Sequence, residues 1–324
     1  MKAWIKEVIM AHEVESMIYV GPEPWHGLGV AVPEGAKLNI GEAIKAAGLD
    51  WEVELRHIFV EDQLGGRIGI LDYYASCRKR DNAILGIVGP DYRPLQNREA
   101  FEWFQPFFKE GNAIIETAGS LKGGKKIWIL ARVKDNALTI RKDDEVCNYV
   151  LLSNSHDGSM PVSIGFTPIR VVCNNTLSMA HESKASKLLR VRHTLNLHIN
   201  LKNIRDVMDL ATREFKATTK QYRELAAKGI KAKDLENYVK KVFEIRDIKN
   251  SKTFPKVVYL FENGRGSRAA GTTYWGAYNA INEYLNYFRG KTQDSILENL
   301  WYGDGAMTNR KALRVALDMA KAAA

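Results

Sequence analysis

Residues 146–173 read VCNYVLLSNSHDGSMPVSIGFTPIRVVC, and this stretch decides the fold. Two runs rich in β-branched and aromatic residues, 146–153 and 162–173, are short enough for strands. Between them stands Asp157-Gly158, a dipeptide that suits the positive φ angles of tight hairpin turns. The stretch therefore predicts a β-hairpin.

The same pattern extends toward the N-terminus. Apolar and charged residues alternate over 51–56, residues 68–77 are β-branched and aromatic, and Gly65-Gly66 lies between them. Further turn pairs precede short apolar runs at 83–88 and 127–130. These hairpins predict a mostly antiparallel sheet in the first half of the chain.

Two helices interrupt the predicted sheet. Asn39 and Glu42 form a capping-box pattern in front of a short apolar stripe, and Gly48 is expected to end that helix. Asn97 is expected to cap a second helix that runs to Lys109, with a kink or an early end at Pro106.

From residue 184 the apolar period changes from two residues to about three and a half. A heptad seam predicts the longest helix, which Gly229 ends. Its members are Leu201, Ile204, Met208, Ala211, Phe215, Thr218, Tyr222 and Leu225.

The rest of the chain predicts shorter elements. Residues 234–245 fit a helix, 257–261 a strand, and Thr272 or Thr273 starts an aromatic helix; Thr308 is expected to cap the last one. The fold class is therefore α+β, with a mostly antiparallel, hairpin-rich sheet in the first half and a basic helical second half. The predicted divisions are a sheet domain at 1–183, a basic helical region at 184–256 and a strand–helix region at 257–324.

The formal charge of +9 is unevenly distributed. Lys and Arg against Asp and Glu number 20 against 24 in residues 1–183, 19 against 8 in 184–256 and 8 against 6 in 257–324, so the balances are −4, +11 and +2. This segregation predicts an anionic partner, nucleic acid first. Acidic residues are interspersed along the seam helix, so part of the +11 is also an ordinary solvated face.

Composition excludes several classes of protein. Three cysteines without CxxC spacing argue against a disulfide framework or a zinc site, and the seven histidines show no metal-binding spacing. We expect no cofactor and no metal. Neither a signal peptide nor a run of 18 apolar residues is found, so we expect a soluble protein in a reducing cytoplasm with no membrane partner.

Two glycine-rich segments resemble phosphate-binding motifs. Residues 119–125 have the spacing of a P-loop, but Lys126 replaces the Ser or Thr that binds magnesium, and a strand follows where the motif needs a helix. We interpret this segment as a hairpin turn that carries three lysines. Residues 264–269 lack the surrounding βαβ unit of a dinucleotide fingerprint, and we interpret them as a basic loop whose Arg265 and Arg268 are open to an anion.

Basic and aromatic residues alternate on several predicted strands and turns. Single-stranded nucleic acid is bound by this combination, because cations follow the phosphates while aromatic rings stack on bases. The competing interpretation is that the aromatics pack the core and the charges are solvated turns. The candidate binding residues are Arg78, Lys79, Arg80, Lys122, Lys125, Lys126, Trp128, Arg141, Lys142 and Arg170.

Eight short motifs occur along the chain: Met10–Glu13, Pro24–Gly29, Ala47–Trp51, Leu85–Gly89, Ala118–Ser120, Asn154–Ser159, Arg170–Thr176 and Tyr278–Ala280. Together they resemble the phage/plasmid-like protein family of unknown function. The resemblance implies a home in bacterial phages, prophages and plasmids, hence the bacterial cytoplasm, and it supplies no catalytic residues. A fold-level similarity links the hairpin-rich basic sheet to the single-strand annealing recombinases of phages, which work as rings.

Three functional hypotheses follow. The first is a non-enzymatic, oligomeric single-stranded DNA-binding protein that extends to strand annealing in phage or plasmid DNA metabolism. The second is an interaction protein that binds a host protein, for example to block defence, through the seam around Phe215 and Tyr222. The third is a thiol enzyme centred on Cys173, with Asn174, Asn175 and His193 supplying an oxyanion donor and a base.

Overall fold

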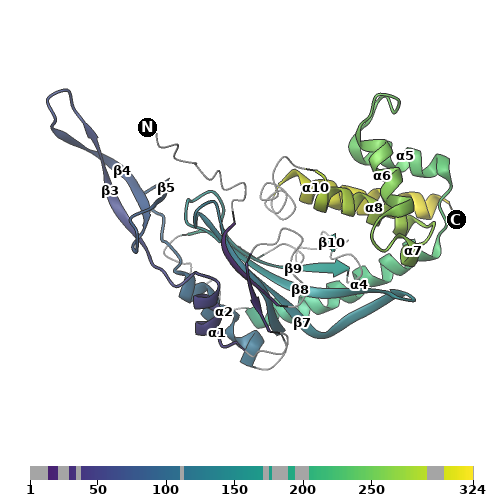
Figure 1. Ribbon diagram of the computed structural model, residues 1–324, viewed down its shortest axis with the longest axis horizontal. Helices are drawn as coiled ribbons and strands as arrows, with labels where there is room; N and C mark the ends of the chain where they lie inside the picture. Colours follow the sequence, from purple (N-terminus) through teal and green to yellow (C-terminus); the bar gives the residue numbers. More distant parts are fainter. Residues whose placement is uncertain are drawn as a thin grey trace, which may run out of the picture.

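The structure, a computed structural model, describes residues 14–20, 29–33, 38–109, 113–170, 175–176, 189–193, 204–289 and 303–323. Its elements form three parts in a row (Figure 1): a protruding hairpin arm, a central sheet with two small helices on it, and a cluster of helices at the opposite end. The α+β prediction is confirmed, with the sheets in the first half of the chain and most helices in the second.

The central sheet has eight strands. Seven follow the order β10-β9-β8-β7-β6-β1-β2, and β11 pairs with β9. The pairing is antiparallel except between β1 and β2, which are parallel. The strands are β1 (Val14–Val20), β2 (Val30–Val32), β6 (Ala113–Leu121), β7 (Lys126–Arg141), β8 (Asp144–Ser155), β9 (Val162–Arg170), β10 (Asn175–Thr176) and β11 (Leu189–Val191).

The hairpin predicted around Asp157-Gly158 is confirmed as β8–β9, and Gly158 has the expected positive φ of 73°. The turn at 122–125 likewise joins β6 to β7. Residues at the start of β7 alternate between the two faces of the sheet, because successive side chains of a strand point to opposite sides. Ile127 and Ile129 pack in the core under the small helices, whereas Trp128 and Leu130 belong to a separate cluster.

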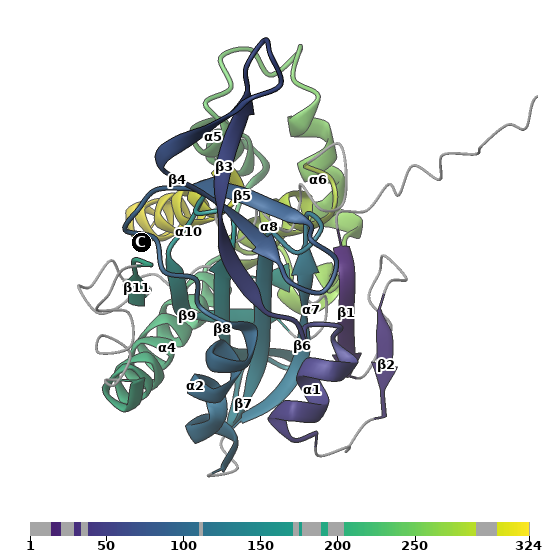
Figure 2. The same ribbon diagram turned by 90° about the vertical axis from the view of Figure 1, so that its left-hand side faces the viewer.

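Helices α1 (Ile40–Ala46) and α2 (Asn97–Lys109) cover one face of the sheet (Figure 2). Asn39 caps α1 through the predicted capping box with Glu42. Asn97 does not cap α2: the helix includes it, and its side chain instead donates to the carbonyl of Leu49 at 2.9 Å. Leu49 is buried beneath the helices, so this hydrogen bond holds the Asn97 amide in the interior, away from the end of the helix.

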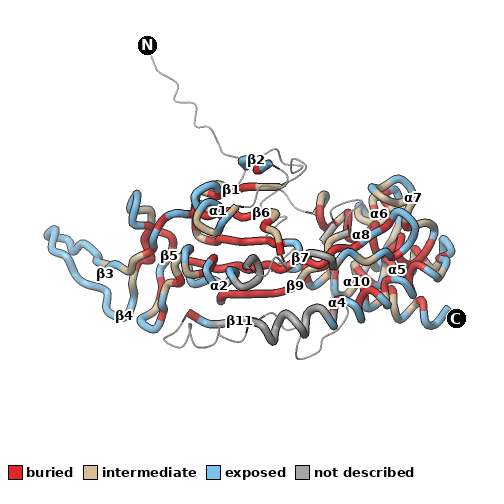
Figure 3. The backbone as a smooth tube through the Cα atoms, turned by 90° about the horizontal axis from the view of Figure 1, so that it is seen from below, coloured by how far each residue is buried: buried red, intermediate tan, exposed pale blue. Residues whose placement is uncertain are grey.

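A second, three-stranded sheet forms the arm. Its order is β3-β4-β5, with β3 (Val53–Glu61), β4 (Arg67–Arg78) and β5 (Ile84–Val88). β5 pairs only with the base of β4, over Tyr74–Cys77, so the outer arm is a two-stranded hairpin. Figure 3 shows this outer part exposed over almost its whole length.

The helices of the second half pack around one aromatic core. Their cluster also contains Ile140 and Val146, from the ends of β7 and β8 that point away from the arm, so it joins the sheet to the helices. The helices are α4 (Ile204–Ala227), α5 (Ala232–Phe243), α6 (Thr253–Asn263), α7 (Ser267–Ala270), α8 (Tyr274–Tyr287) and α10 (Asp304–Ala322).

Three local predictions for the second half have clear outcomes. The cap at Thr273 is confirmed, because its side chain accepts from the backbone of Gly276. The strand at 257–261, and with it the strand of the predicted 257–324 region, is wrong: those residues lie inside α6, whose buried Val257 and Leu260 are spaced for one helix face. Thr308 lies inside α10 rather than at its start.

Candidate functional site

The cations at 78–80 lie among carboxylates. Arg78 is 6% exposed and forms ion pairs with Glu15 at 2.6 Å and Asp81 at 2.8 Å. Lys79 pairs with Glu52 at 2.7 Å, and Arg80 lies 3.7 Å from Glu15. Three of the predicted binding residues are therefore balanced by the protein's own acids.

The pKa shifts agree with this balance. Burial alone would lower the pKa of Arg78, but hydrogen bonds to Asp81 and Glu15 outweigh it and raise the pKa. The hydrogen bond from Arg78 lowers the pKa of Asp81, and the bond from Lys79 lowers that of Glu52. A cation whose charge is already met inside the chain adds little attraction for a phosphate outside it.

The lysine turn lies beside this cluster. Gly124 packs so closely that a Cβ there would meet Arg78 Nη1 at 2.9 Å and Glu15 Oε2 at 3.2 Å, so the turns at 78–81 and 122–125 meet, as a joint contact would require. Lys126 is only 9% exposed, however, and both it and Lys122 already take part in interactions within the chain. Only part of this turn is open to a ligand.

Trp128 does not present a ring to a ligand. It is 3% exposed, packs in a buried cluster of the sheet and donates its indole N–H to the hydroxyl of Thr117 at 3.1 Å. A base cannot stack on a ring that the protein already covers, so we remove Trp128 from the candidate binding residues. Arg170 ends β9, and its side chain lies outside what the structure describes.

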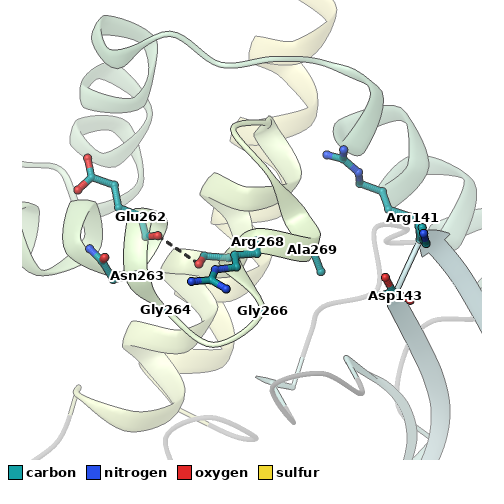
Figure 4. A pocket seen from close by; sticks show the side chains of 10 residues that line it. Arg141, Asp143, Glu262, Asn263, Gly264, Gly266, Arg268 and Ala269 are labelled. Atoms are coloured by element: carbon teal, nitrogen blue, oxygen red, sulfur yellow. Dashed lines mark hydrogen bonds between the residues drawn. The ribbon is translucent and has the colours of Figure 1, made fainter.

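The remaining two predicted residues, Arg141 and Lys142, line a cleft of about 760 Å³. One wall is the β7–β8 turn, residues 141–143, and the other is the end of α6, the loop after it and α7, residues 262–264 and 266–269 (Figure 4). The structure thus brings together two segments that the sequence marked separately, the basic strand end and the basic glycine loop. We name this site the basic cleft.

Two glycines set the shape of the basic cleft. A Cβ on Gly264 would lie 2.4 Å from the carbonyl oxygen of Leu260 and from the carboxylate of Glu283, so only glycine fits. Gly271 has a φ of 66°, and a Cβ there would lie 2.8 Å from Arg141 Nη1. Without that Cβ, Arg141 approaches α7 and donates to the carbonyl of Ala270 at 2.7 Å.

Gly264→Ala is therefore expected to lower the melting temperature. The new methyl group would push against backbone and against a buried carboxylate, and strain of this kind costs about 1–3 kcal/mol. Thermal unfolding followed by circular dichroism measures the effect. Gly89→Ala, where the added methyl meets nothing within 4 Å, is the matched control and should melt like the parent; equal melting of the two variants would contradict the tight fit.

The cations of the basic cleft differ from those at 78–80. Arg141, Lys142 and Arg268 are exposed, as is Arg265 in the loop between α6 and α7. Within the described part of the chain, none of these four has a carboxylate oxygen within 4.0 Å. Asp143 and Glu262 also line the cleft, so its net charge is modest, although its cations have no acidic partner among the described residues.

Exposed aromatic rings adjoin the basic cleft. Tyr259 is 56% and Phe288 45% exposed, and the ammonium of Lys256 lies 5.4 Å and 4.0 Å from the centres of their rings. The guanidinium of Arg265 lies 4.7 Å from the ring of Tyr287. Tyr259 precedes Glu262 and Asn263 by one helical turn, so it shares their face of α6. Lys256 and Arg265 therefore each lie beside aromatic rings, and Tyr259 shares a helix face with two residues that line the basic cleft.

Sequence reasoning missed Lys256, Tyr259, Tyr287 and Phe288. Interpreting 257–261 as a strand hid the i, i+3 relation between Lys256 and Tyr259, which only a helix produces. A helical interpretation would have left Tyr259 off the stripe of Val257 and Leu260. An aromatic off the buried stripe of a helix is the signal that could have found this surface.

The structure bears differently on the two alternative hypotheses, the host-protein surface and the thiol enzyme. The seam residues Phe215 and Tyr222 are fully buried in the helical core, so they cannot be the surface that binds a host protein. Cys173 lies outside the described residues. His193 is buried and stacks on Tyr92 with ring centres 4.7 Å apart, and its Nδ1 lies 3.1 Å from the carbonyl of Arg93.

Two further properties of the described residues bear on function. No helix in these parts of the chain is long and apolar enough to cross a bilayer. Across the same residues, no group of three or more histidine, cysteine or acidic side chains is arranged to hold a metal ion.

Comparison with known proteins gives a family but no activity. No curated protein and no solved structure matches the chain. A family model described as "Domain of unknown function (DUF932)" matches residues 84–301, which include the basic cleft, the central strands β6–β9, helix α2 and helices α4 to α8, but not the arm strands β3 and β4. These matched residues cover more than half of the sequence, and the chain belongs to the DUF932 family.

Proposed function

We propose that the protein binds single-stranded DNA, without catalysis, at the basic cleft and the aromatic surface next to it. The observation that carries the proposal is the meeting of Arg141 and Lys142 with Arg268 around one cleft, with Arg265 in the loop between α6 and α7, each without an acidic partner in the described chain. Uncommitted cations of this kind release counterions from a phosphate backbone when they bind it.

The neighbouring rings favour a single strand over a duplex. A base can stack on Tyr259 or Phe288 only when it is not paired and stacked inside a double helix. Lys256, which lies over both rings, would place a charge where the backbone passes between stacked bases. This arrangement supports binding that tolerates any base sequence, because every base has a face to stack.

Removing the cations that lack an acidic partner should weaken binding and reduce its dependence on salt. The triple variant Lys142→Ala, Arg265→Ala, Arg268→Ala loses three phosphate contacts, so the slope of log affinity against log salt should fall by about 2. Affinity at low salt should fall by about 30-fold. Fluorescence anisotropy with a labelled oligothymidine across a salt series measures both quantities.

A charge-matched control uses cations that are already paired. Lys79, Lys240 and Lys311 each contact a carboxylate, so changing all three to Ala removes the same net charge without removing an open contact. An equal loss in both triple variants would mean that net charge, not the basic cleft, attracts the oligonucleotide. No binding by the parent protein at low salt would refute the proposal.

The variant Lys122→Ala, Lys125→Ala, Lys126→Ala tests the site expected from the sequence. We expect it to bind nearly as well as the parent, since two of these lysines are engaged within the chain. The pair Tyr259→Ala, Phe288→Ala should instead lower affinity about 10-fold or more while leaving the salt slope unchanged, because stacking carries no charge.

The wider role rests on the sequence resemblance. We extend the proposal to strand annealing in phage or plasmid DNA metabolism, in the cytoplasm of a bacterial host. The resemblance to phage and plasmid proteins and the hairpin-rich sheet support this extension. A strand-annealing assay with two complementary labelled oligonucleotides tests it, and binding without faster annealing would limit the function to binding.

A further inference from the structure

The outer arm exposes large apolar side chains to solvent. On β3 and β4 these include Phe59 at 54%, Val60 at 48% and Ile68 at 55% exposure, and Leu71 reaches 83%. Opposite His57 and Ile58, β4 carries three extra residues, 71–73, and Asp72 among them has a φ of 66°. Phe59 and Val60 are consecutive on β3 and therefore point to opposite faces, so both faces of the hairpin carry exposed apolar residues.

The arm also leaves backbone edges open. Among the described strands β3 pairs only with β4, so its outer edge is free from Glu54 to Glu61; at Val53 the side chain of Gln96 satisfies both backbone groups. A two-stranded hairpin is marginally stable in water by itself. An open edge with an apolar face is a template for adding another strand.

We propose that β3 of one chain pairs antiparallel with β3 of a second copy, which joins two arm sheets across a two-fold axis. The apolar residues of β3 and the pairing of His57 with Glu61 select the register. With Phe59 on the axis, Ile58 lies opposite Val60 of the second copy and His57 lies opposite Glu61. Each of these two contacts occurs twice, as a two-fold interface requires.

The register satisfies the rules of strand pairing. A two-fold axis perpendicular to the sheet keeps each side chain on its own face, so opposite residues must differ by an even number of positions. The pairs 59 with 59, 58 with 60 and 57 with 61 meet this condition. Cross-strand pairs of opposite charge or of apolar residues are the favourable ones.

The exposed apolar area of the arm is large enough for a second copy of the chain to be the binding partner. The exposed apolar residues of β3, of β4 and of the turn between them are Phe59, Val60, Leu64, Ile68, Ile70, Leu71 and Tyr73. With about 200 Å² for each fully exposed residue of this size, they offer roughly 850 Å² per copy, compared with about 800 Å² from each partner in a standard interface.

Charge argues against nucleic acid as the occupant. Residues 58–73 contain Glu61, Asp62 and Asp72 against Arg67 alone, which gives 1 − 3 = −2 in a chain of net charge +9. A phosphate backbone would be repelled by this arm. Self-association through β3 is independent of the proposed DNA binding, because the arm and the basic cleft lie at opposite ends of the molecule (Figure 1).

Sedimentation equilibrium of the full chain over the micromolar range tests the proposal. The parent should show a monomer–dimer equilibrium, and Phe59→Lys should raise its Kd by about 100-fold, because two like charges would meet on the axis. Ile84→Lys is the matched control: Ile84 is 64% exposed on β5, at the other edge of the same sheet, and its Kd should match the parent's. A monomeric parent, or an equal loss in both variants, would overturn the proposal.

A charge swap tests the register. Glu61→Lys removes the carboxylate opposite His57 and should weaken the dimer, and His57→Glu, which places two carboxylates opposite each other, should weaken it as well. The double variant His57→Glu, Glu61→Lys pairs opposite charges and should recover the Kd of the parent. Both side chains are exposed, so neither change threatens folding. If the double variant dimerises no better than the single ones, the proposed pairing is wrong.

Discussion

Tyr222→Ala is expected to lower the free energy of unfolding of the isolated chain by about 3–5 kcal/mol, the usual cost of deleting a large buried aromatic ring. Tyr222 is fully buried, with its ring centre 4.9 Å from that of Trp275 and 6.1 Å from that of Tyr278. Truncation would leave a cavity between α4 and α8 that these rings cannot fill without breaking other contacts. Denaturant unfolding followed by circular dichroism measures the loss.

The same variant decides how the heptad seam is used. If the seam were a surface for another protein, Tyr222→Ala would leave the stability of the isolated chain almost unchanged. Lys220→Ala, at an exposed position of the same helix, is the control and should change stability by less than about 0.5 kcal/mol. Equal stability of the two variants would contradict the packing of α4 described above.

Acid is expected to destabilise the sheet domain through His156, which is fully buried. Its Nε2 lies 2.8 Å from Oδ1 of Asn97, and the Asn97 amide donates to Leu49, so Oδ1 is the acceptor and Nε2–H is the donor. Burial lowers the pKa of His156 to about 3, with a smaller contribution from His193 and an opposing one from Asp157. Protonation would place a charged N–H at Nδ1, which has no hydrogen-bond partner in the described structure.

The direction of the pH dependence follows from this lowered pKa. Below pH 6.5 the unfolded chain binds a proton at this residue and the folded chain does not, so stability is complete above pH 6.5 and falls as the pH is lowered toward 3. At pH 4 the loss is about 3 kcal/mol, since each pH unit between the two pKa values costs about 1.4 kcal/mol. Burial also lowers the pKa of His193, which adds a loss of the same sign.

Unfolding free energies at pH 7, 5.5 and 4 measure the effect. His156→Asn should reduce stability at pH 7, because the edge contact of the imidazole with Trp51 is lost, but its stability should fall less steeply with acid. Comparing slopes rather than absolute stabilities separates the titration from the packing defect. An unchanged slope in the variant would show that His156 is not the group that titrates.

Local sequence determined much of the fold. The hairpins at 157–158 and 65–66, the capping box at Asn39 and the cap at Thr273 each depend on residues within a few positions of one another. Backbone preferences and neighbouring hydrogen bonds specify such features before any distant contact forms. The heptad seam also predicted its helix from the sequence. Apolar residues spaced three and four positions apart share one face only in a helix, and the fold buries that face.

The helix at 253–263 shows where local reasoning fails. Over the five residues 257–261, an apolar run fits a strand or a buried helix equally well, and periodicity alone cannot separate them. Packing decided the outcome, since α6 places Val257 and Leu260 against the aromatic core of α8. The helical conformation of α6 also placed Tyr259 on the outside, beside the basic cleft.

The sequence by itself determined where the cations are, and the tertiary structure decided which of them are open to a ligand. Arg78 looks as available as Arg141 in the sequence, but Glu15, 63 positions away, neutralises it in the fold. Arg141 and Arg268, 127 positions apart, instead line one cleft without an acidic partner in the described chain. The physical reason is that electrostatic pairing depends on distance in space, and burial sets its strength, so neither can be assigned to a residue before its distant neighbours are known.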